Sequence, residues 1–291
     1  MLRILMAIAL FGLLCVAWGV LLERRWYRLR RYRLDILPAS GPAKLDVLHL
    51  SDLHFVRVDG RKARWLAGLP EVEVSVVTGD FLAEPEAVEA AVAGVHATRG
   101  SLASWFVLGS NDSYVPRPLN YLNYFRSKER RRRGAVRGRG RELVAQLEAD
   151  GWDDLTNVRR QISLDGLPVE LLGLDDAHIE KHDLRVVPRR AEERFGFAVM
   201  HSPNSAPEAA ACGYDLIVAG HTHGGQVRLP FVGALITNSD MPRRLASGLI
   251  RIGSSLLSLS PGLGTSKYAP FRFWCRPEAT VLELRRKPEG G

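Results

Sequence analysis

Short apolar runs alternate along this chain with segments of helical periodicity. The runs are rich in Val, Leu, Ile and Phe and are bounded by polar or glycine-containing segments, which is typical of buried strands. They lie at residues 45–51, 72–78, 105–108, 171–174, 195–200 and 216–219, with later strands expected at 256–260 and 280–284. Helices are predicted at residues 61–69, 85–98, 141–150 and 205–212. Strands that alternate with helices predict an α/β fold, in which helices flank a sheet.

Side chains able to bind metal ions follow five of these runs. In an open α/β sheet the carboxyl ends of the strands share one edge, so we expect these side chains to converge although they are far apart in the sequence. The residues are Asp52, His54, Asp80, Asn111, Asp112, His201, His221 and His223. The last two belong to the segment Gly220-His221-Thr222-His223-Gly224-Gly225-Gln226. Its glycines are predicted to leave room for a metal ion or a phosphate to approach the backbone.

The mixture of carboxylate, imidazole and amide groups narrows the kind of site. A structural zinc site is expected to use thiolates, but Cys212 and Cys275 do not have such a spacing. A magnesium site for a nucleotide usually accompanies a glycine-rich phosphate loop, and neither common form of that loop is present. The remaining interpretation is a centre of two divalent ions, manganese, iron or zinc, bridged by one carboxylate.

The order of these motifs resembles that of the calcineurin-like metallophosphoesterases, over residues 45–284. The segment around His221, together with Pro-Gly-Leu-Gly-Thr-Ser at 261–266 and Cys-Arg-Pro-Glu at 275–278, is similar to the membrane-anchored bacterial branch. The resemblance implies a four-layer α/β/β/α sandwich and a hydrolase of phosphoesters or phosphoanhydrides. It also implies that one metal binds Asp52, His54 and His223, that Asp80 bridges, and that His201 and His221 hold the second metal.

The chain departs from the family pattern at the turn after residue 108. The family has Gly-Asn-His-Asp, whereas this chain has Gly109-Ser110-Asn111-Asp112. An alignment without a gap puts Ser110 in the place of the Asn ligand, and a shift of one residue puts Asn111 there. We favour Asn111, because an amide oxygen coordinates better than a neutral hydroxyl. Asp80, Asn111 and Asp112 are the predicted catalytic residues.

Neither alignment leaves a histidine in the position that usually assists the leaving group. A phosphate leaving group has a second pKa near 6 and departs with little help from an acid. We therefore expect a phosphodiesterase or pyrophosphatase, acting on an anionic or lipid-linked substrate. Members of the resembled family that cleave the pyrophosphate of UDP-2,3-diacylglucosamine make such a substrate plausible. Predicted substrate contacts are Asp176, which follows the apolar run at 171–174, Gln226, Arg130 and Arg131.

The amino terminus predicts a single-pass membrane protein. Residues 4–22 carry no formal charge and match the roughly 20 residues that span a bilayer as a helix. A short flank at 1–3 precedes this anchor, and a basic linker is expected at 23–44, the catalytic domain at 45–286 and a tail at 287–291. One arginine precedes the span and six follow it closely, which predicts a cytoplasmic catalytic domain. A cleaved signal peptide is disfavoured because no Ala-x-Ala site is evident.

Two basic patches, at residues 1–33 (+6) and 126–141 (+8), give the chain its net charge of +8, because the remaining residues carry −6. The second patch belongs to a predicted loop insertion at 115–141, which is either a solvated loop or a contact for an anionic head group or membrane surface. The alternative function is a nucleic-acid or nucleotide phosphoesterase, or a non-catalytic membrane-anchored RNA-binding protein. Aromatic residues precede the arginine run but none lies within it, so no specific nucleic acid is expected as a partner. The sequence leaves the oligomeric state open.

Overall fold

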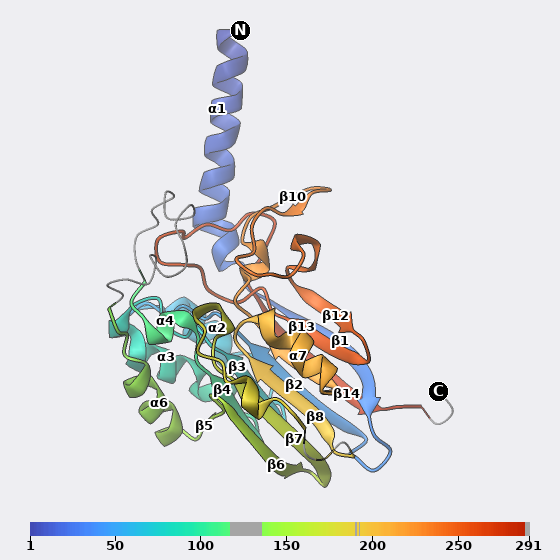
Figure 1. Ribbon diagram of the computed structural model, residues 1–291. Helices are drawn as coiled ribbons and strands as arrows, with labels where there is room; N and C mark the ends of the chain where they lie inside the picture. Colours follow the sequence, from blue (N-terminus) through green and yellow to red (C-terminus); the bar gives the residue numbers. More distant parts are fainter. Residues whose placement is uncertain (117–135, 190, 192, 289–291) are drawn as a thin grey trace.

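Two six-stranded sheets face each other, and helices cover their outer faces (Figure 1). The computed structural model describes residues 1–116, 136–189, 191 and 193–288. The first sheet has the order β1 (Arg28–Leu37), β14 (Glu278–Arg286), β2 (Lys44–Leu50), β3 (Val74–Thr78), β4 (Ala103–Val107) and β5 (Asp153–Asp154). The second has the order β12 (Gly248–Ile252), β13 (Ser255–Leu259), β9 (Leu216–Ala219), β8 (Phe195–Met200), β7 (Leu167–Leu174) and β6 (Val158–Leu164). A hairpin, β10 (Arg228–Leu229) and β11 (Gly233–Ala234), stands apart from both sheets.

The four helices predicted at residues 61–69, 85–98, 141–150 and 205–212 are present, with ends shifted by one or two residues, whereas the one-turn helix at Ser110–Ser113 was not predicted. Among the described residues, the α-helices are α1 (Leu2–Ala17), α2 (Gly60–Ala67), α3 (Val88–Val95), α4 (Ser110–Ser113), α6 (Gly140–Ala149) and α7 (Ala206–Ala211). Short turns of other helix types are η1 (Trp18–Leu22), η2 (Glu23–Arg25), η3 (Pro85–Ala87), η4 (His96–Thr98), η6 (Ala177–Ile179), η7 (Leu184–Val186), η8 (Pro203–Ser205), η9 (His223–Gly225) and η10 (Arg243–Leu245). The predicted helix at 85–98 is realised as η3, α3 and η4 in succession.

Central strands are continuous apolar runs because both of their faces are buried. In β9, Leu216 and Val218 belong to the core between the two sheets, whereas Ile217 and Ala219 belong to the core under α7. A third core lies between the first sheet and the helices α2, α3 and α6. These three cores separate four layers, which confirms the α/β/β/α sandwich. The expectation of one shared sheet edge needs correction, because two sheets contribute strands to the site.

The prediction of a linker over residues 23–44 is wrong in its middle part, which forms strand β1. This strand runs parallel to β14 along its whole length. Leu34 and Leu37 are buried in the core between the sheets or at its margin. The Arg28 and Arg30 side chains form ion pairs with the buried Glu278 carboxylate, at 2.5 and 3.0 Å. The strand was not predicted because the charge of its arginines suggests solvent exposure. Their ion-pair partner, Glu278, lies near the other end of the chain.

The N-terminal helix projects from the domain (Figure 1). Residues Leu2–Arg25 form a helical segment of 24 residues that is long and apolar enough to cross a membrane by length and composition. The predicted span at 4–22 lies within this segment, and most of its apolar side chains are exposed. Such exposure is what a bilayer-embedded helix requires, because lipid takes the place of a protein core.

Strand β1 should be required for the stability of the domain. We expect a chain that begins at residue 45 to be less stable than one that begins at residue 26, since only the second retains β1. Burial of a leucine contributes about 1.5–3 kcal/mol, so the loss of Leu34 and Leu37 should lower the free energy of unfolding by about 3–6 kcal/mol. Urea unfolding followed by circular dichroism measures this difference, and equal free energies would contradict the assignment of β1 to the core fold.

Candidate metal centre

The predicted ligands lie in tight turns at the carboxyl ends of strands from both sheets. Five of these residues have a left-handed backbone, which is uncommon for residues other than glycine. They are Asp52 (φ 47°), His54 (φ 44°), Asp80 (φ 53°), His221 (φ 71°) and His223 (φ 50°). Backbone strain of this kind tends to occur at functional sites, where the surrounding structure holds it in place. Here each turn directs its side chain into a common space between the sheet ends.

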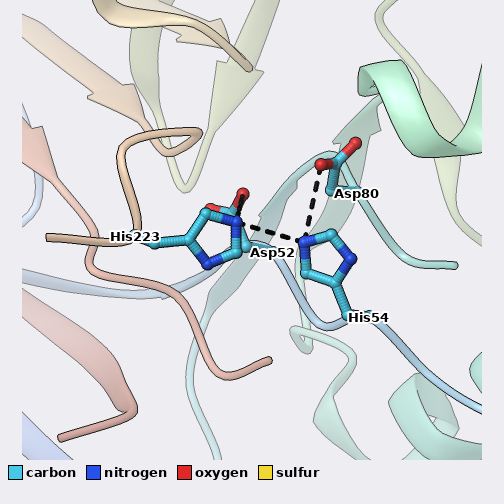
Figure 2. A group of neighbouring side chains, drawn as sticks. All are labelled: Asp52, His54, Asp80 and His223. Carbon is cyan, nitrogen blue, oxygen red and sulfur yellow. Dashed lines mark hydrogen bonds and ion pairs between the residues drawn. The ribbon is translucent and has the colours of Figure 1, made fainter. Parts of the chain in front are cut away.

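The first group of side chains consists of Asp52, His54, Asp80 and His223, whose ligand atoms all lie within 4.8 Å of one another. Figure 2 shows these four side chains converging on one point. The His54 Nε2 atom lies 3.5 Å from Asp80 Oδ2 and 3.2 Å from His223 Nε2. The His223 Nε2 atom lies 3.4 Å from Asp52 Oδ1. Two carboxylates and two imidazoles thus enclose a space of the size that one metal ion needs.

The second group consists of Asp176, His201 and His221, with ligand atoms again within 4.8 Å. The His201 Nε2 atom lies 3.2 Å from His221 Nδ1 and 3.7 Å from Asp80 Oδ1. Asp80 therefore contacts both groups, with one carboxylate oxygen toward each. Asp176, which the sequence suggested as a substrate contact, is fully buried and lies in this second group.

Hydrogen bonds to backbone carbonyls fix the orientation of two of the imidazoles. His201 Nδ1 lies 2.7 Å from the carbonyl oxygen of Thr78, and His221 Nε2 lies 3.2 Å from that of Asn238. A ring nitrogen that faces a carbonyl must carry the hydrogen, so the other nitrogen of a neutral ring has its lone pair toward the centre. Metal-binding histidines usually have such a second hydrogen bond.

The charges of the site are those of a cation-binding centre. Burial lowers the pKa of His54 to about 4, and burial together with His201 lowers that of His221 to about 4. Burial also opposes the charged form of His201, but the carboxylates of Asp80, Asp176 and Asp52 overcome it and raise its pKa to about 10. Burial would raise the pKa of Asp52 and Asp80, yet the surrounding imidazoles hold both below their usual range. Both carboxylates are therefore ionised at neutral pH.

Unsatisfied atoms indicate that the residues fit a metal ion. Among the described residues, the buried Asp52 Oδ1 and Asp176 Oδ2 atoms accept no hydrogen bond. An unpaired buried carboxylate oxygen is costly, and a divalent cation would satisfy it. The donor set of imidazole nitrogen and carboxylate oxygen suits manganese, iron or zinc.

The turn at residues 109–112 brings Asn111 to the centre. Its backbone N–H donates to Asp80 Oδ1 at 2.8 Å, and its side-chain Nδ2 donates to Asp80 Oδ2 at 2.5 Å. Ser110 also lines the cleft but has no hydrogen bond of this kind among the described residues. The Asp112 carboxylate is buried under the turn, where it accepts the backbone N–H groups of Gly109 (2.9 Å) and Leu82 (3.0 Å). Burial and the nearby Asp80 raise the pKa of Asp112 to about 7.

A cleft of about 320 Å³ opens over the two groups. Gln226 lines the cleft, and its Nε2 atom donates to the carbonyl oxygen of Ala269 at 2.7 Å. His178 also lines the cleft and packs against the His221 ring, with 4.5 Å between ring centroids. Arg130 and Arg131, the other predicted substrate contacts, lie outside the described residues.

Sequence reasoning missed a set of contacts that ties the N-terminal helix to the site. The Glu23 carboxylate accepts the backbone N–H of Cys275 at 2.6 Å, and the Cys275 thiol donates to the His223 carbonyl oxygen at 3.3 Å. The buried Arg272 guanidinium donates to the carbonyl oxygen of Gly264 at 2.6 Å. The Gly264 N–H in turn donates to the carbonyl oxygen of Asp52 at 2.6 Å. No local sequence pattern indicates these partners, because they are up to 252 residues apart.

Comparisons with known proteins agree with this geometry. The sequence model of the family described as "Calcineurin-like phosphoesterase" matches residues 45–225, more than half of the chain. The chain is 33% identical over 141 residues to the uncharacterized metallophosphoesterase YkuE of Bacillus subtilis (strain 168), covering 48% of this chain and about half, 49%, of that protein. It is 26% identical to the uncharacterized metallophosphoesterase YkoQ of the same organism, over 86% of each protein. It is also 26% identical to phosphodiesterase YaeI of Escherichia coli (strain K12), over 90% of each.

The match to the family model, residues 45–225, includes every residue of both groups of side chains. The chain belongs to the calcineurin-like phosphoesterase family, and it is a hydrolase that acts on phosphoester bonds.

Proposed function

We propose that this protein is a membrane-anchored phosphodiesterase or pyrophosphatase with a centre of two divalent metal ions. The observation that carries this proposal is the position of Asp80, with one carboxylate oxygen toward His54 and the other toward His201. Asp52, His54 and His223 would hold one ion, and His201 and His221 the other. Asn111 is the proposed further ligand, because its side chain reaches Asp80. Asp176 adds a carboxylate beside the second ion.

Two bound metal ions would polarise the phosphoryl group and provide a nucleophile from water at neutral pH. The residues of the chain set the protonation state and the orientation of the side chains that would bind the ions. Burial keeps His54 and His221 neutral at pH 7, so their lone pairs are free to coordinate. Asn111 orients the Asp80 carboxylate through its backbone and side-chain N–H groups. Asp112 holds the turn that presents Asn111, and this positioning role is the catalytic contribution that we propose for it.

The proposed substrate class follows from what lines the cleft beside Asp80. Asn111 occupies the turn where relatives in the resembled family have a histidine that assists the leaving group. An amide cannot act as a general acid at neutral pH, so the leaving group must depart with little protonation. Pyrophosphates and activated phosphodiesters have such leaving groups. Gln226, at the edge of the cleft, and the basic residues Arg130 and Arg131 are the proposed contacts to an anionic head group.

The membrane role rests on the apolar N-terminal helix. A single apolar helix followed by six arginines predicts an anchor with the catalytic domain in the cytoplasm. In this arrangement the enzyme acts on substrates at the inner surface of the cell membrane.

Removal of single ligands should lower the metal content stepwise. We expect His54→Ala and His201→Ala each to lower the content from about two ions per chain to about one. Even loss of an outer partner of a metal ligand costs about 10–100-fold, so hydrolysis should fall by at least about 100-fold. Elemental analysis of the purified full-length chain and steady-state kinetics measure both effects. His96→Ala is the matched control, since its exposed imidazole pairs with Asp150 away from the centre; full activity in either ligand variant would refute the assignment.

Metal uptake should release a proton from His201. In the metal-free chain the pKa of His201 is about 10, so its imidazole is protonated at pH 7 and must lose that proton to coordinate. His54 and His221, with pKa values of about 4, are already neutral and release none. Calorimetric titration with manganese in buffers of different ionisation enthalpy should show release of at least about one proton per chain, since Asp112, with a pKa of about 7, is also partly protonated. His201→Gln should lower that release by about one proton, and a heat of binding that is independent of buffer would count against the charge state described above.

Substrate preference tests the leaving-group argument. A general acid contributes about 100-fold or more to such reactions, so the manganese-loaded protein should cleave bis(p-nitrophenyl) phosphate and pyrophosphate diesters about 100-fold faster than glycerol phosphate. The measurement is kcat/KM for each substrate, with Asp80→Asn to identify contaminating activity. Faster cleavage of glycerol phosphate would exclude the proposed substrate class.

A further inference from the structure

The hairpin formed by β10 and β11 exposes a cluster of apolar side chains at its tip. Phe231 is fully exposed, with a relative accessibility of 110%, and Val232 is 63% exposed. The exposed apolar residues of the hairpin and its return strand are Leu229, Phe231, Val232, Leu235 and Ile236. A contiguous exposed apolar patch usually marks a surface that meets a membrane or another protein.

The tip has a strained backbone that packing within the chain does not support. The Val232 N–H donates to the Pro230 carbonyl oxygen at 2.8 Å, across Phe231 with φ of 64°. This is a γ-turn whose central residue has a positive φ, a form that is rare and strained. A bulky residue is disfavoured there, and glycine would be the ordinary choice. The strain holds the aromatic ring away from the domain, which points to an external partner.

Hydrogen bonds connect the hairpin to the N-terminal helix through the segment of Arg272 and Phe273. The Arg272 N–H donates to the Gly19 carbonyl oxygen at 3.3 Å, and the Arg228 N–H donates to the Phe273 carbonyl oxygen at 2.9 Å. Gly19 lies three residues before the end of the apolar span at Leu22, about 4.5 Å along a helix. The hairpin therefore starts at the depth where the helix enters the bilayer, and Figure 1 shows β10 on the same side of the domain as α1.

Aromatic and basic residues surround this region in the manner of a membrane interface. Trp26 and Trp274 are 50% and 62% exposed, and the Arg276 guanidinium lies 4.0 Å from the centroid of the Trp26 ring. Arg243 is exposed, and its Nη1 atom donates to the Leu235 carbonyl oxygen at 3.1 Å beside the hairpin. Tryptophan is enriched at the level of lipid head groups, and arginine is attracted to anionic lipids there.

We propose that the tip of the hairpin, residues 229–232, inserts into the bilayer next to the transmembrane helix as a second membrane contact. This inference rests on the membrane anchoring in the proposed function but not on the catalytic activity. Apolar side chains insert into the acyl region, while Arg243 and Arg276 bind anionic head groups. With the helix as the single membrane contact, the domain could rotate about the helix axis and the cleft could face any direction. Two contacts fix the orientation of the domain relative to the bilayer.

Fixed orientation brings the cleft to the head groups. Ile236 and Asn238 follow the hairpin in the sequence, and both line the cleft over the metal ligands. Ala234 of β11 packs against Gly225, so closely that a Cβ atom on Gly225 would lie 2.4 Å from the Ala234 Cβ. The hairpin and the cleft wall therefore form one unit. The substrate class that fits this arrangement is an amphiphile with a phosphodiester or pyrophosphate head group that remains in the membrane.

Depth measurement on the full-length chain tests the insertion. The protein is reconstituted into phosphatidylcholine vesicles with a minority of phosphatidylglycerol, and a fluorophore is attached at Phe231→Cys or, as a second variant, at Val232→Cys. Cys15→Ser and Cys212→Ser remove the other accessible thiols, while Cys275 is buried. Leu102→Cys is the matched control, because this exposed leucine precedes β4 at the sheet edge opposite the site. Lipid-attached nitroxide should quench the label at 231 several-fold more than that at 102, and aqueous iodide should do the reverse.

Equal quenching of the two labels by iodide would overturn the proposal. Protection of residue 231 from both quenchers would overturn it too, in favour of a protein partner such as a second copy of the chain. In a parallel assay, Phe231→Ser combined with Val232→Ser should leave hydrolysis of soluble bis(p-nitrophenyl) phosphate unchanged and lower hydrolysis of a vesicle-held pyrophosphate lipid several-fold. Quenching by lipid without any hydrolysis would refute the proposed function alone, and hydrolysis without lipid quenching would refute the hairpin proposal alone.

Discussion

The Asp80 carboxylate contacts imidazoles from both sheets, with Oδ2 at 3.5 Å from His54 and Oδ1 at 3.7 Å from His201. His54 follows β2 of the first sheet, and His201 follows β8 of the second. Two ring nitrogens 3.2 Å apart would repel one another if both presented lone pairs, so a hydrogen or a positive charge must lie between them. In the metal-free chain a proton on His201 supplies part of that charge. The two sheet ends therefore bring carboxylates and imidazoles together where a bound cation would relieve the repulsion between their lone pairs.

The N-terminal helix is coupled to this centre by more than its peptide connection. Glu23 at its base binds the backbone of Cys275, whose thiol donates to the carbonyl of His223. Strand β1, which follows the helix, is paired along its length with β14 in the first sheet. A displacement of the helix would thus affect both His223 and the core between the sheets. The base of the N-terminal helix is part of the folded domain, and separation at a boundary near residue 45 would also remove the edge strand β1.

The sequence predicts correctly that the candidate ligands follow strand ends, because strand periodicity is a local signal. The apolar runs before Asp52, Asp80 and His201 place those residues at strand ends, where the structure has them. The partition of the strands into two sheets has no local signal, since a buried parallel strand has the same composition in either sheet. Asp176 illustrates the consequence: the sequence places it at a strand end, but only the fold brings it to His201. Strand β1 was not predicted because its arginines suggest solvent exposure. The hairpin was not predicted because it has too few paired residues to produce an alternating pattern.

The two glycines after His223 have a different role from the one expected from the sequence. The expectation from sequence was that they leave room for a metal ion or a phosphate. Instead, a Cβ atom on Gly224 would lie 2.7 Å from the Cys275 sulfur, and one on Gly225 would meet Ala234 of the hairpin. Both glycines also have positive φ, of 62° and 81°, which other residues adopt only with strain. Their small size lets the segment bound to Glu23 and the apolar hairpin pack directly behind His223. The motif therefore joins His221 and His223 to the hairpin and to the segment that binds the base of the N-terminal helix.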